Sequence, residues 1–247
     1  DKNLIDEISN KYKLAKKSFF SITDVVAGES FKKKIKKISN ILKKKNVNFL
    51  FVSAPENVAW VLNIRGFDSP YSPIPNCRLI LDDKNKFYLI VEKTKVSNLL
   101  KDNKIKSYQI IDPRRFPFFL NKLKKGKMII DNKTCSIFNI NLIKKNFRIK
   151  NNDDPIYLLK SIKNSTEIRN MIDCHIRDGV ALTKFLYWIK NINKKKITEV
   201  DAQNKLEKFR RKNKNFLYPS FDTIAGSGKN GAIVHYRANK KNCRTIR

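Results

Sequence analysis

Apolar runs of strand length alternate with amphipathic helical patterns from Phe31 to Lys150, and this alternation restricts the fold more than any other feature. Apolar residues recur at helical spacing over residues 31–42, and an apolar strand follows over 47–52. A hairpin is predicted over 78–91. Further helices are expected over 93–100, 116–123 and 136–143, and further strands over 108–111, 128–130 and 147–150. The spacing indicates a mixed α/β domain.

The composition turns polar at Asn151–Pro155, which indicates a domain boundary. We therefore expect residues 1–30 to be a linker or the tail of a preceding domain. The α/β domain is predicted over 31–152 and a second domain over 153–247. With 247 residues, the chain is long enough for each part to have a core.

Two helices are predicted in the second segment. Asn164 is placed to cap the first, and Thr198 opens the second with Glu199 and Asp201 in its first turn, where acids favour the helix dipole. The stripe expected to be buried on the first helix consists of Ile168, Ile172, His175, Gly179, Leu182, Phe185 and Ile189. A histidine on an apolar face is usually a satisfied core residue, so His175 is predicted to be structural.

The chain carries 54 Lys and Arg against 22 Asp and Glu, a formal net charge of +32. Such a field attracts polyanions without specificity. The lysines recur in every segment, however, and no nucleic-acid-binding motif accompanies them. We therefore expect nonspecific polyanion attraction and no dedicated nucleic-acid site.

The four cysteines, Cys77, Cys135, Cys174 and Cys243, lie far apart and form no C-x-x-C pair. This distribution is typical of reduced thiols in a cytoplasmic protein. No apolar run approaches the roughly 18 residues that a membrane helix needs, so no membrane association is expected. The first residue is Asp rather than Met, which suggests a fragment or a processed form.

One of the two histidines lies in the stretch SFDTIAGSGKNGAIVHYR, residues 220–237. This stretch has the pattern of two strands, 220–224 and 232–237, joined by a glycine-rich loop. His235 then stands near a strand end beside a flexible loop. From the pattern alone, it is either a structural hydrogen-bonding residue or part of a functional site.

The sequence of this stretch resembles the segment that opens the catalytic domain of aminopeptidase P, a family of Xaa-Pro aminopeptidases. A second phrase, ENVAWVLNIRGFDSPYSPIP over residues 56–75, is similar to the family's second domain, and TEVDAQNKLEKFRR over 198–211 is similar to a helix of its third. The resemblance extends from about Phe31 to Arg247. It implies a creatinase-like α/β domain over 31–152 and an incomplete pita-bread catalytic domain over 153–247.

The resemblance also implies a function. The family removes the N-terminal residue that precedes proline in a peptide, and many members are homodimers. In the family, the histidine that matches His235 contacts the substrate near the scissile bond without binding metal. His235 is therefore the catalytic and substrate-binding residue that the resemblance implies.

Catalysis in the family depends on two divalent ions, usually manganese, which bind and activate the attacking hydroxide. Two aspartates, a histidine and two glutamates hold them, and in the family all five follow the segment that matches His235. This sequence stops at Arg247, before the first of them. We therefore expect the chain by itself to have no metal ligands, to bind no metal cofactor and to be inactive.

Two alternatives remain open at this stage. Prolidase-like dipeptidases share the two-domain organisation, although the sequence around Trp60 and Arg65 is typical of the three-domain aminopeptidases. A non-catalytic binding protein or pseudo-enzyme with a pita-bread domain is the other alternative. The +32 charge suits polyanionic partners but not basic ones such as histones.

Overall fold

The structure is a computed structural model that describes residues 17–193 and 196–246. The chain divides into two compact units, Asp1–Thr166 and Glu167–Arg247, called the first and the second unit below. None of the helices within the described ranges combines the length and the apolar character needed to cross a lipid bilayer.

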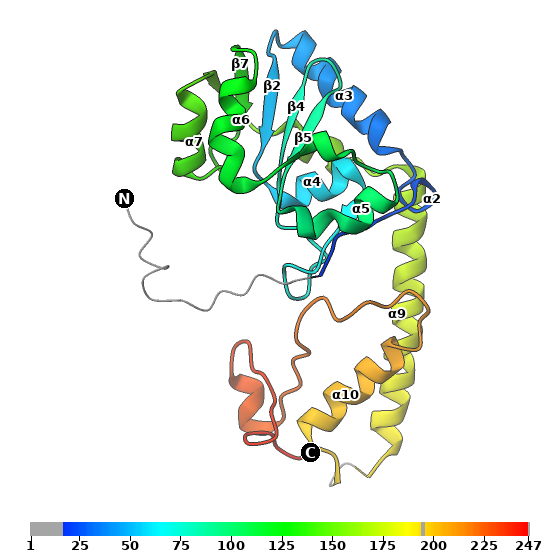
Figure 1. Ribbon diagram of the computed structural model, residues 1–247. Coiled ribbons are helices and arrows are strands. Elements are labelled where there is room, and N and C mark those ends of the chain that lie inside the picture. The colour runs from blue at the N-terminus through cyan, green and yellow to red at the C-terminus, as the bar shows by residue number, and fades with distance from the viewer. Residues whose placement is uncertain (1–16, 194–195, 247) are drawn as a thin grey trace. The chain divides into compact units, whose positions relative to one another are not determined.

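A six-stranded mixed sheet forms the centre of the first unit (Figure 1). In spatial order its strands are β6 (Ile110–Ile111), β5 (Phe87–Ile90), β4 (Arg78–Asp82), β2 (Phe49–Val52), β7 (Lys127–Ile130) and β8 (Arg148–Asn151). Strand β2 is antiparallel to β4 and parallel to β7, and β8 continues the parallel side. The predicted hairpin is confirmed as β4 and β5.

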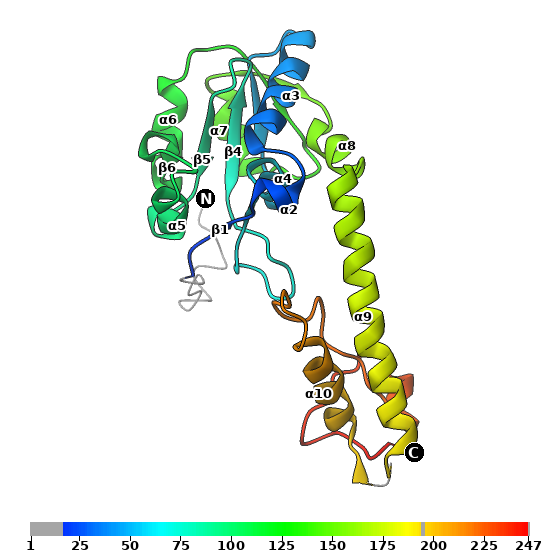
Figure 2. The ribbon, with the colours of Figure 1, turned by 90° about the vertical axis from the view of Figure 1, so that its right-hand side faces the viewer.

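Helices cover both faces of this sheet, so the first unit has three layers (Figure 2). The helices that lie wholly in this unit are α2 (Asp24–Ala27), α3 (Phe31–Lys44), α4 (Pro55–Leu62), α5 (Ser97–Lys101), α6 (Phe116–Lys122), α7 (Ile137–Lys144) and α8 (Pro155–Ser161), of which α2 has no buried residue. Successive side chains of a strand point to opposite faces. Leu50 and Val52 therefore join a core with α3 and α4, whereas Phe49 and Phe51 join a second core with α6 and α7. The predicted mixed α/β fold is confirmed.

Part of the stretch expected to be a linker, residues 1–30, packs within the first unit. Phe19 is fully buried in the core that contains α3, and its backbone N–H donates to the Lys95 carbonyl at 2.7 Å. The next two residues form β1 (Phe20–Ser21), which pairs with β3 (Ile64–Arg65). Residues 1–16 of this expected linker lie outside the described residues.

The first unit continues beyond the boundary that the sequence placed after residue 152. Ile156 of α8 is fully buried in the core with α4. Beside it, the buried Asp154 carboxylate accepts a hydrogen bond from Asn57 Nδ2 at 2.8 Å. The backbone N–H of Asp154 in turn donates to Asp131 Oδ2 at 3.0 Å. These contacts attach α8 to the α/β core, so the polar composition of residues 151–155 marks a buried hydrogen-bond network.

The second unit contains most of α9 (Ser165–Asn191), the helix α10 (Glu199–Arg210) and a long C-terminal segment. Asn164 Oδ1 accepts from the Thr166 N–H at 3.0 Å, as expected of a residue that caps α9. The buried stripe predicted on α9 is wrong, because Ile172 is 56% exposed and Leu182 is 41% exposed. Within α9, only Ala181 is buried among the described side chains. The apolar spacing was correct, but the described part of this unit has no sheet to cover it.

The strand pair predicted over residues 220–237 is also wrong. The structure has irregular backbone there, with a single 3₁₀ helix, Gly228–Ala232, where the loop and the second strand were expected to meet. Two strands alone are marginally stable in water and need a further strand or a packed face. No sheet lies within the described residues of the second unit, so the segment takes its shape from side-chain hydrogen bonds instead.

We predict that residues 17–166 fold alone, whereas residues 167–247 do not. Both large hydrophobic cores lie wholly in the first unit. The isolated first unit should melt cooperatively in a calorimeter. Replacing Leu50, fully buried in β2, by Ala should lower its free energy of unfolding by about 2–5 kcal/mol. A cooperative melt of residues 167–247 alone would contradict this prediction.

Candidate functional site

The segment that contains His235 is attached to the start of α10. The N-cap of this helix is Thr198, whose Oγ1 accepts from the Asp201 N–H at 3.1 Å. Asp201 Oδ2 in return accepts from the Thr198 N–H at 3.0 Å, which completes a capping box. These hydrogen bonds from Thr198 lower the pKa of Asp201. The predicted start of this helix is confirmed, and Glu199, the residue after the cap, is buried.

Glu199 is fully buried and its carboxylate is the centre of a hydrogen-bond network. It accepts from the Ser227 N–H at 2.6 Å, from Asn230 Nδ2 at 2.9 Å, from the Tyr236 hydroxyl at 2.7 Å and from the Arg244 N–H at 3.0 Å. The donors come from three parts of the C-terminal segment. One carboxylate therefore joins the start of α10 to the segment that contains His235.

Burial and hydrogen bonding have opposite effects on the pKa of the Glu199 carboxyl group. Burial raises its pKa, but the hydrogen bonds from Tyr236, Arg244, Asn230 and Ser227 together lower the pKa below its ordinary value of 4.5. The ionised carboxylate therefore stabilises this segment above pH 4.5, and the stabilisation is lost as the pH falls through the lowered pKa. Burial, together with the bond to Glu199, raises the pKa of Tyr236 to about 12, so its hydroxyl remains a donor at neutral pH.

His235 lies beside the buried Tyr236, and its own side chain is exposed. Its backbone has a φ of 55°, in the left-handed region that few residues other than glycine adopt. The preceding Val234 is 82% exposed, and the following Arg237 forms an ion pair with Asp222 at 2.9 Å. His235 therefore adjoins in sequence a residue that is bound to Glu199, and its imidazole is exposed.

The other histidine occupies a different setting. His175 is exposed on α9, where its Nδ1–H donates to the Met171 carbonyl at 2.8 Å. It is therefore not the core residue predicted from the apolar stripe. Its hydrogen bond is local to the helix, which agrees with a structural role.

The residues present do not fit a dinuclear metal centre. Over residues 17–193 and 196–246, no three His, Cys, Asp or Glu side chains come close enough together to hold an ion. Glu199, the fully buried acid of the second unit, already accepts four protein donors. Its oxygens are satisfied by the protein itself.

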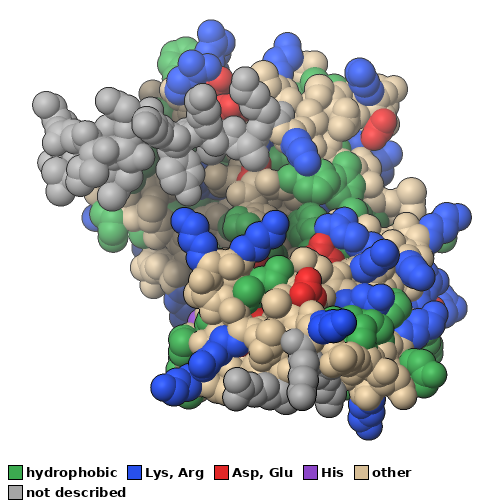
Figure 3. Space-filling view, turned by 90° about the horizontal axis from the view of Figure 1, so that it is seen from below, with side chains coloured by type: hydrophobic (Ala, Val, Ile, Leu, Met, Phe, Trp, Pro, Cys, Tyr) green, Lys and Arg blue, Asp and Glu red, His purple; other side chains and the backbone are tan. Residues whose placement is uncertain are grey.

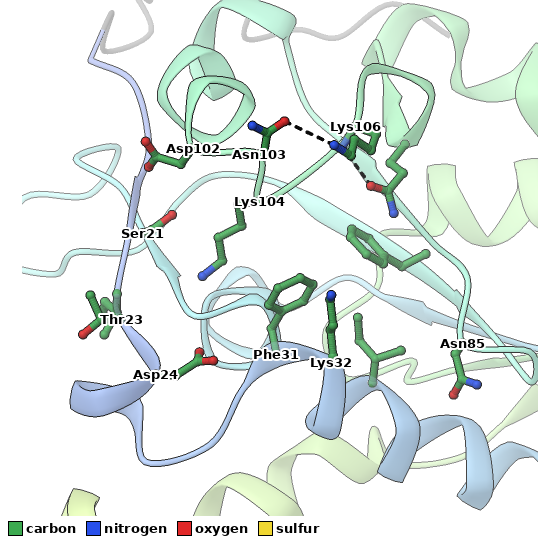
Figure 4. Close-up of a pocket in the computed structure, with 14 residues that line it drawn as sticks. Ser21, Thr23, Asp24, Phe31, Lys32, Asn85, Asp102, Asn103, Lys104 and Lys106 are labelled. Carbon is green, nitrogen blue, oxygen red and sulfur yellow. Dashed lines mark hydrogen bonds between the residues drawn. The ribbon is translucent and has the colours of Figure 1, made fainter.

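A separate hollow of about 690 Å³ lies in the first unit, between the start of α3 and the loops at 21–24 and 102–106 (Figure 4). Lys104 extends into it toward Phe31, with Nζ 5.3 Å from the ring centre, and donates to the Asn63 carbonyl at 3.1 Å. Burial lowers the pKa of Lys104. The wall carries both lysines and aspartates, so its charges largely balance.

The sequence comparisons identify the two units separately. Residues 10–167 match the creatinase/prolidase N-terminal domain, and residues 169–246 match metallopeptidase family M24. The chain therefore belongs to the creatinase/prolidase family of M24 metallopeptidases.

Among curated relatives, the resemblance to aminopeptidase P is confirmed. Xaa-Pro aminopeptidase 1 of Dictyostelium discoideum is 34% identical over 99% of this chain and 41% of its own length. The probable Xaa-Pro aminopeptidase P of Paracoccidioides brasiliensis strain Pb03 is 38% identical over 89% of this chain and 38% of its own length. The chain thus spans about two fifths of these relatives.

Solved structures show the same fold. The X-prolyl aminopeptidase of Caenorhabditis elegans, described as a cytosolic enzyme with a di-nuclear active site, has a TM-score of 0.84 at 23% identity over 99% of this chain and 42% of its own. The prolidase of Pyrococcus furiosus has a TM-score of 0.57 at 24% identity, over 84% of this chain and 57% of its own.

The central position of Glu199 is the feature that sequence reasoning missed. The sequence placed Glu199 with Asp201 among helix-capping acids, which is correct for Asp201. The sequence did contain an indication of this role. The capping box uses only the acid at 201, so the acid at 199 has no capping function to explain it. Its partner Tyr236 is 37 residues away, and no local pattern predicts that contact.

We predict that Glu199→Gln loosens the segment 227–244 while α10 remains folded. The Gln amide group would face donors that now bind a carboxylate, leaving buried polar groups unsatisfied. Amide hydrogen exchange at Ser227 and Arg244 should accelerate by about a hundredfold, equivalent to about 2.7 kcal/mol.

The matched control for this change is Glu207→Gln, on the same helix, which removes an ion pair with the exposed Arg211. Surface pairs of this kind contribute about 0.3–0.5 kcal/mol, so exchange at the two amides should be nearly unchanged. Equal acceleration in both variants would show that Glu199 does not anchor the segment.

Proposed function

We propose that this chain is a portion of an Xaa-Pro aminopeptidase, which removes the N-terminal residue preceding proline from a peptide. The observation that supports this most is the 34–38% identity to Xaa-Pro aminopeptidases across 89–99% of the chain. The prolidase-like alternative has less support, because the TM-score is 0.57 for a prolidase and 0.84 for an X-prolyl aminopeptidase.

In this proposal His235 contacts the peptide near the scissile bond and does not bind metal. Its exposed imidazole can exchange hydrogen bonds with a substrate, and the neighbouring Tyr236 is held by Glu199 at 2.7 Å. A group that is held in place before the substrate binds loses little conformational entropy on binding. Such preorganised groups are the ones that stabilise a transition state. Glu199 then acts as a positioning residue for His235.

The complete enzyme uses two divalent ions in this proposal, with manganese the expected metal because hard oxygen ligands favour it. The solved Caenorhabditis elegans relative is described as having a di-nuclear active site. We propose that the ligands lie outside the residues described above and that the 247 residues alone are inactive. We also propose a cytoplasmic enzyme that forms homodimers, in line with its four free cysteines and with the cytosolic relative.

We predict that His235→Ala, in an enzyme that includes this chain and the family's metal ligands, lowers kcat/KM on an Xaa-Pro tripeptide by about a hundredfold or more. The physical reason is the loss of a group that contacts the reacting atoms. Bound metal, measured by elemental analysis, should stay unchanged because the imidazole is not a ligand.

The control is His175→Ala, which removes the only other histidine of the chain from an exposed helix surface. Its activity should equal that of the parent enzyme. If His235→Ala lost metal in step with activity, the assigned role would be wrong. Activity restricted to Xaa-Pro dipeptides would instead favour a prolidase.

We predict that the 247-residue chain, dialysed against manganese, carries well under one ion per chain and releases no residue from an Xaa-Pro peptide. It has only two histidines, and its net charge of +32 repels divalent cations from weak sites. Elemental analysis and a peptide assay test this. Two ions per chain with measurable hydrolysis would refute the proposed inactivity.

A further inference from the structure

A small cleft lies at the edge of the first unit's sheet, where β7 and β8 begin and α3 ends. Its volume is about 330 Å³. The residues that line it are Lys45, Asn46, Lys127, Arg148, Ile149 and Lys150. Four of these six carry a positive charge.

The sheet register brings three of these cations together. Lys127 and Arg148 are direct partners in the parallel pair of β7 and β8. Neighbouring strands lie about 5 Å apart, so these two side chains extend from adjacent points on the same face of the sheet. Lys150 is two residues after Arg148 and lies on that face too. The convergence is thus a property of two paired strands.

The fourth cation comes from the end of α3. Lys45 is the C-cap of this helix, and the following Asn46 turns the chain with a φ of 51°. The turn directs the chain into β2 beside the start of β7, where the Asn48 N–H donates to the Lys127 carbonyl at 3.1 Å. A helix end and two strand starts therefore form one basic wall.

These cations are not neutralised within the described part of the chain. No Asp or Glu lines the cleft, and none of its four cations forms an ion pair with a described residue. Elsewhere cations do find acids, as in Lys95 with Asp68 and Lys133 with Asp153. Four like charges facing one hollow repel one another, and an anion placed among them relieves that repulsion.

High overall charge does not account for this arrangement. On the face shown in Figure 3, Lys and Arg side chains are scattered over the surface with Asp and Glu among them. Scattered surface charges are screened over about 8 Å at physiological ionic strength. In the cleft, by contrast, the four cations share one concave wall and can contact the same ligand.

We propose that this cleft binds a short linear phosphate chain, an oligophosphate. Arg148 suits bidentate contact with phosphate oxygens, and the three lysines supply point charges around it. A nucleic acid fits less well, because the wall has no aromatic side chain on which a base could stack. Ile149 is its one apolar member. This inference does not depend on the proposed peptidase function.

The test is calorimetric titration of the 247-residue chain with tripolyphosphate in 150 mM KCl, where nonspecific attraction is weakened. We expect saturable binding of one molecule per chain. The double variant Lys127→Gln/Arg148→Gln should weaken it by about tenfold or more, because two charge-assisted hydrogen bonds are removed. The control Lys36→Gln/Lys101→Gln removes the same charge from exposed positions outside the cleft and should change the dissociation constant less than about twofold.

A second double variant in the cleft, Lys45→Gln/Lys150→Gln, should also weaken binding. Both side chains are exposed, so these substitutions should leave the fold intact. Circular dichroism melts should show an unchanged transition for every variant without ligand. Equal weakening in cleft and control variants, or no saturable binding by the parent chain, would overturn the proposal. Tighter binding of a single-stranded RNA oligonucleotide than of tripolyphosphate, lost in the same cleft variants, would overturn it in favour of a nucleic-acid surface.

Discussion

The first unit depends on the burial of β2 on both of its faces. Phe49 and Phe51 point into the core with α6 and α7, whereas Leu50 and Val52 point into the core with α3 and α4. Each such side chain contributes about 1.5–3 kcal/mol when it leaves water. Because β2 pairs with β4 on one side and β7 on the other, its position sets both the hairpin and the parallel half of the sheet.

The second unit is organised by a polar interaction instead. Its buried apolar residues among those described are Ala181, Ala202, Leu206 and Tyr236, too few for a large core. The buried carboxylate of Glu199 supplies the organising contact, since four donors from distant parts of the C-terminal segment converge on it. A buried charge is tolerated only when its hydrogen bonds are complete, so the segment has little freedom to rearrange around it.

This contrast relates the fold to the proposed chemistry. A residue that contacts substrate has to be exposed, and exposed loops are mobile unless something fixes them. His235 meets both requirements because it is exposed and adjoins Tyr236, which is 5% exposed and bound to Glu199. The basic cleft follows a similar rule in the first unit, where the β7–β8 register holds Lys127 beside Arg148.

The sequence by itself determined the local elements and the family. Short-range patterns predict an element without knowing which other element packs against it. Examples are the apolar spacing of α3, the apolar run of β2 and the turn between β4 and β5. The Glu199–Tyr236 contact, the exposed stripe of α9 and the irregular backbone at 220–237 were decided by tertiary structure. An apolar stripe is buried only if another element covers it, and a strand forms only beside another strand, so neither outcome is contained in the segment's own residues.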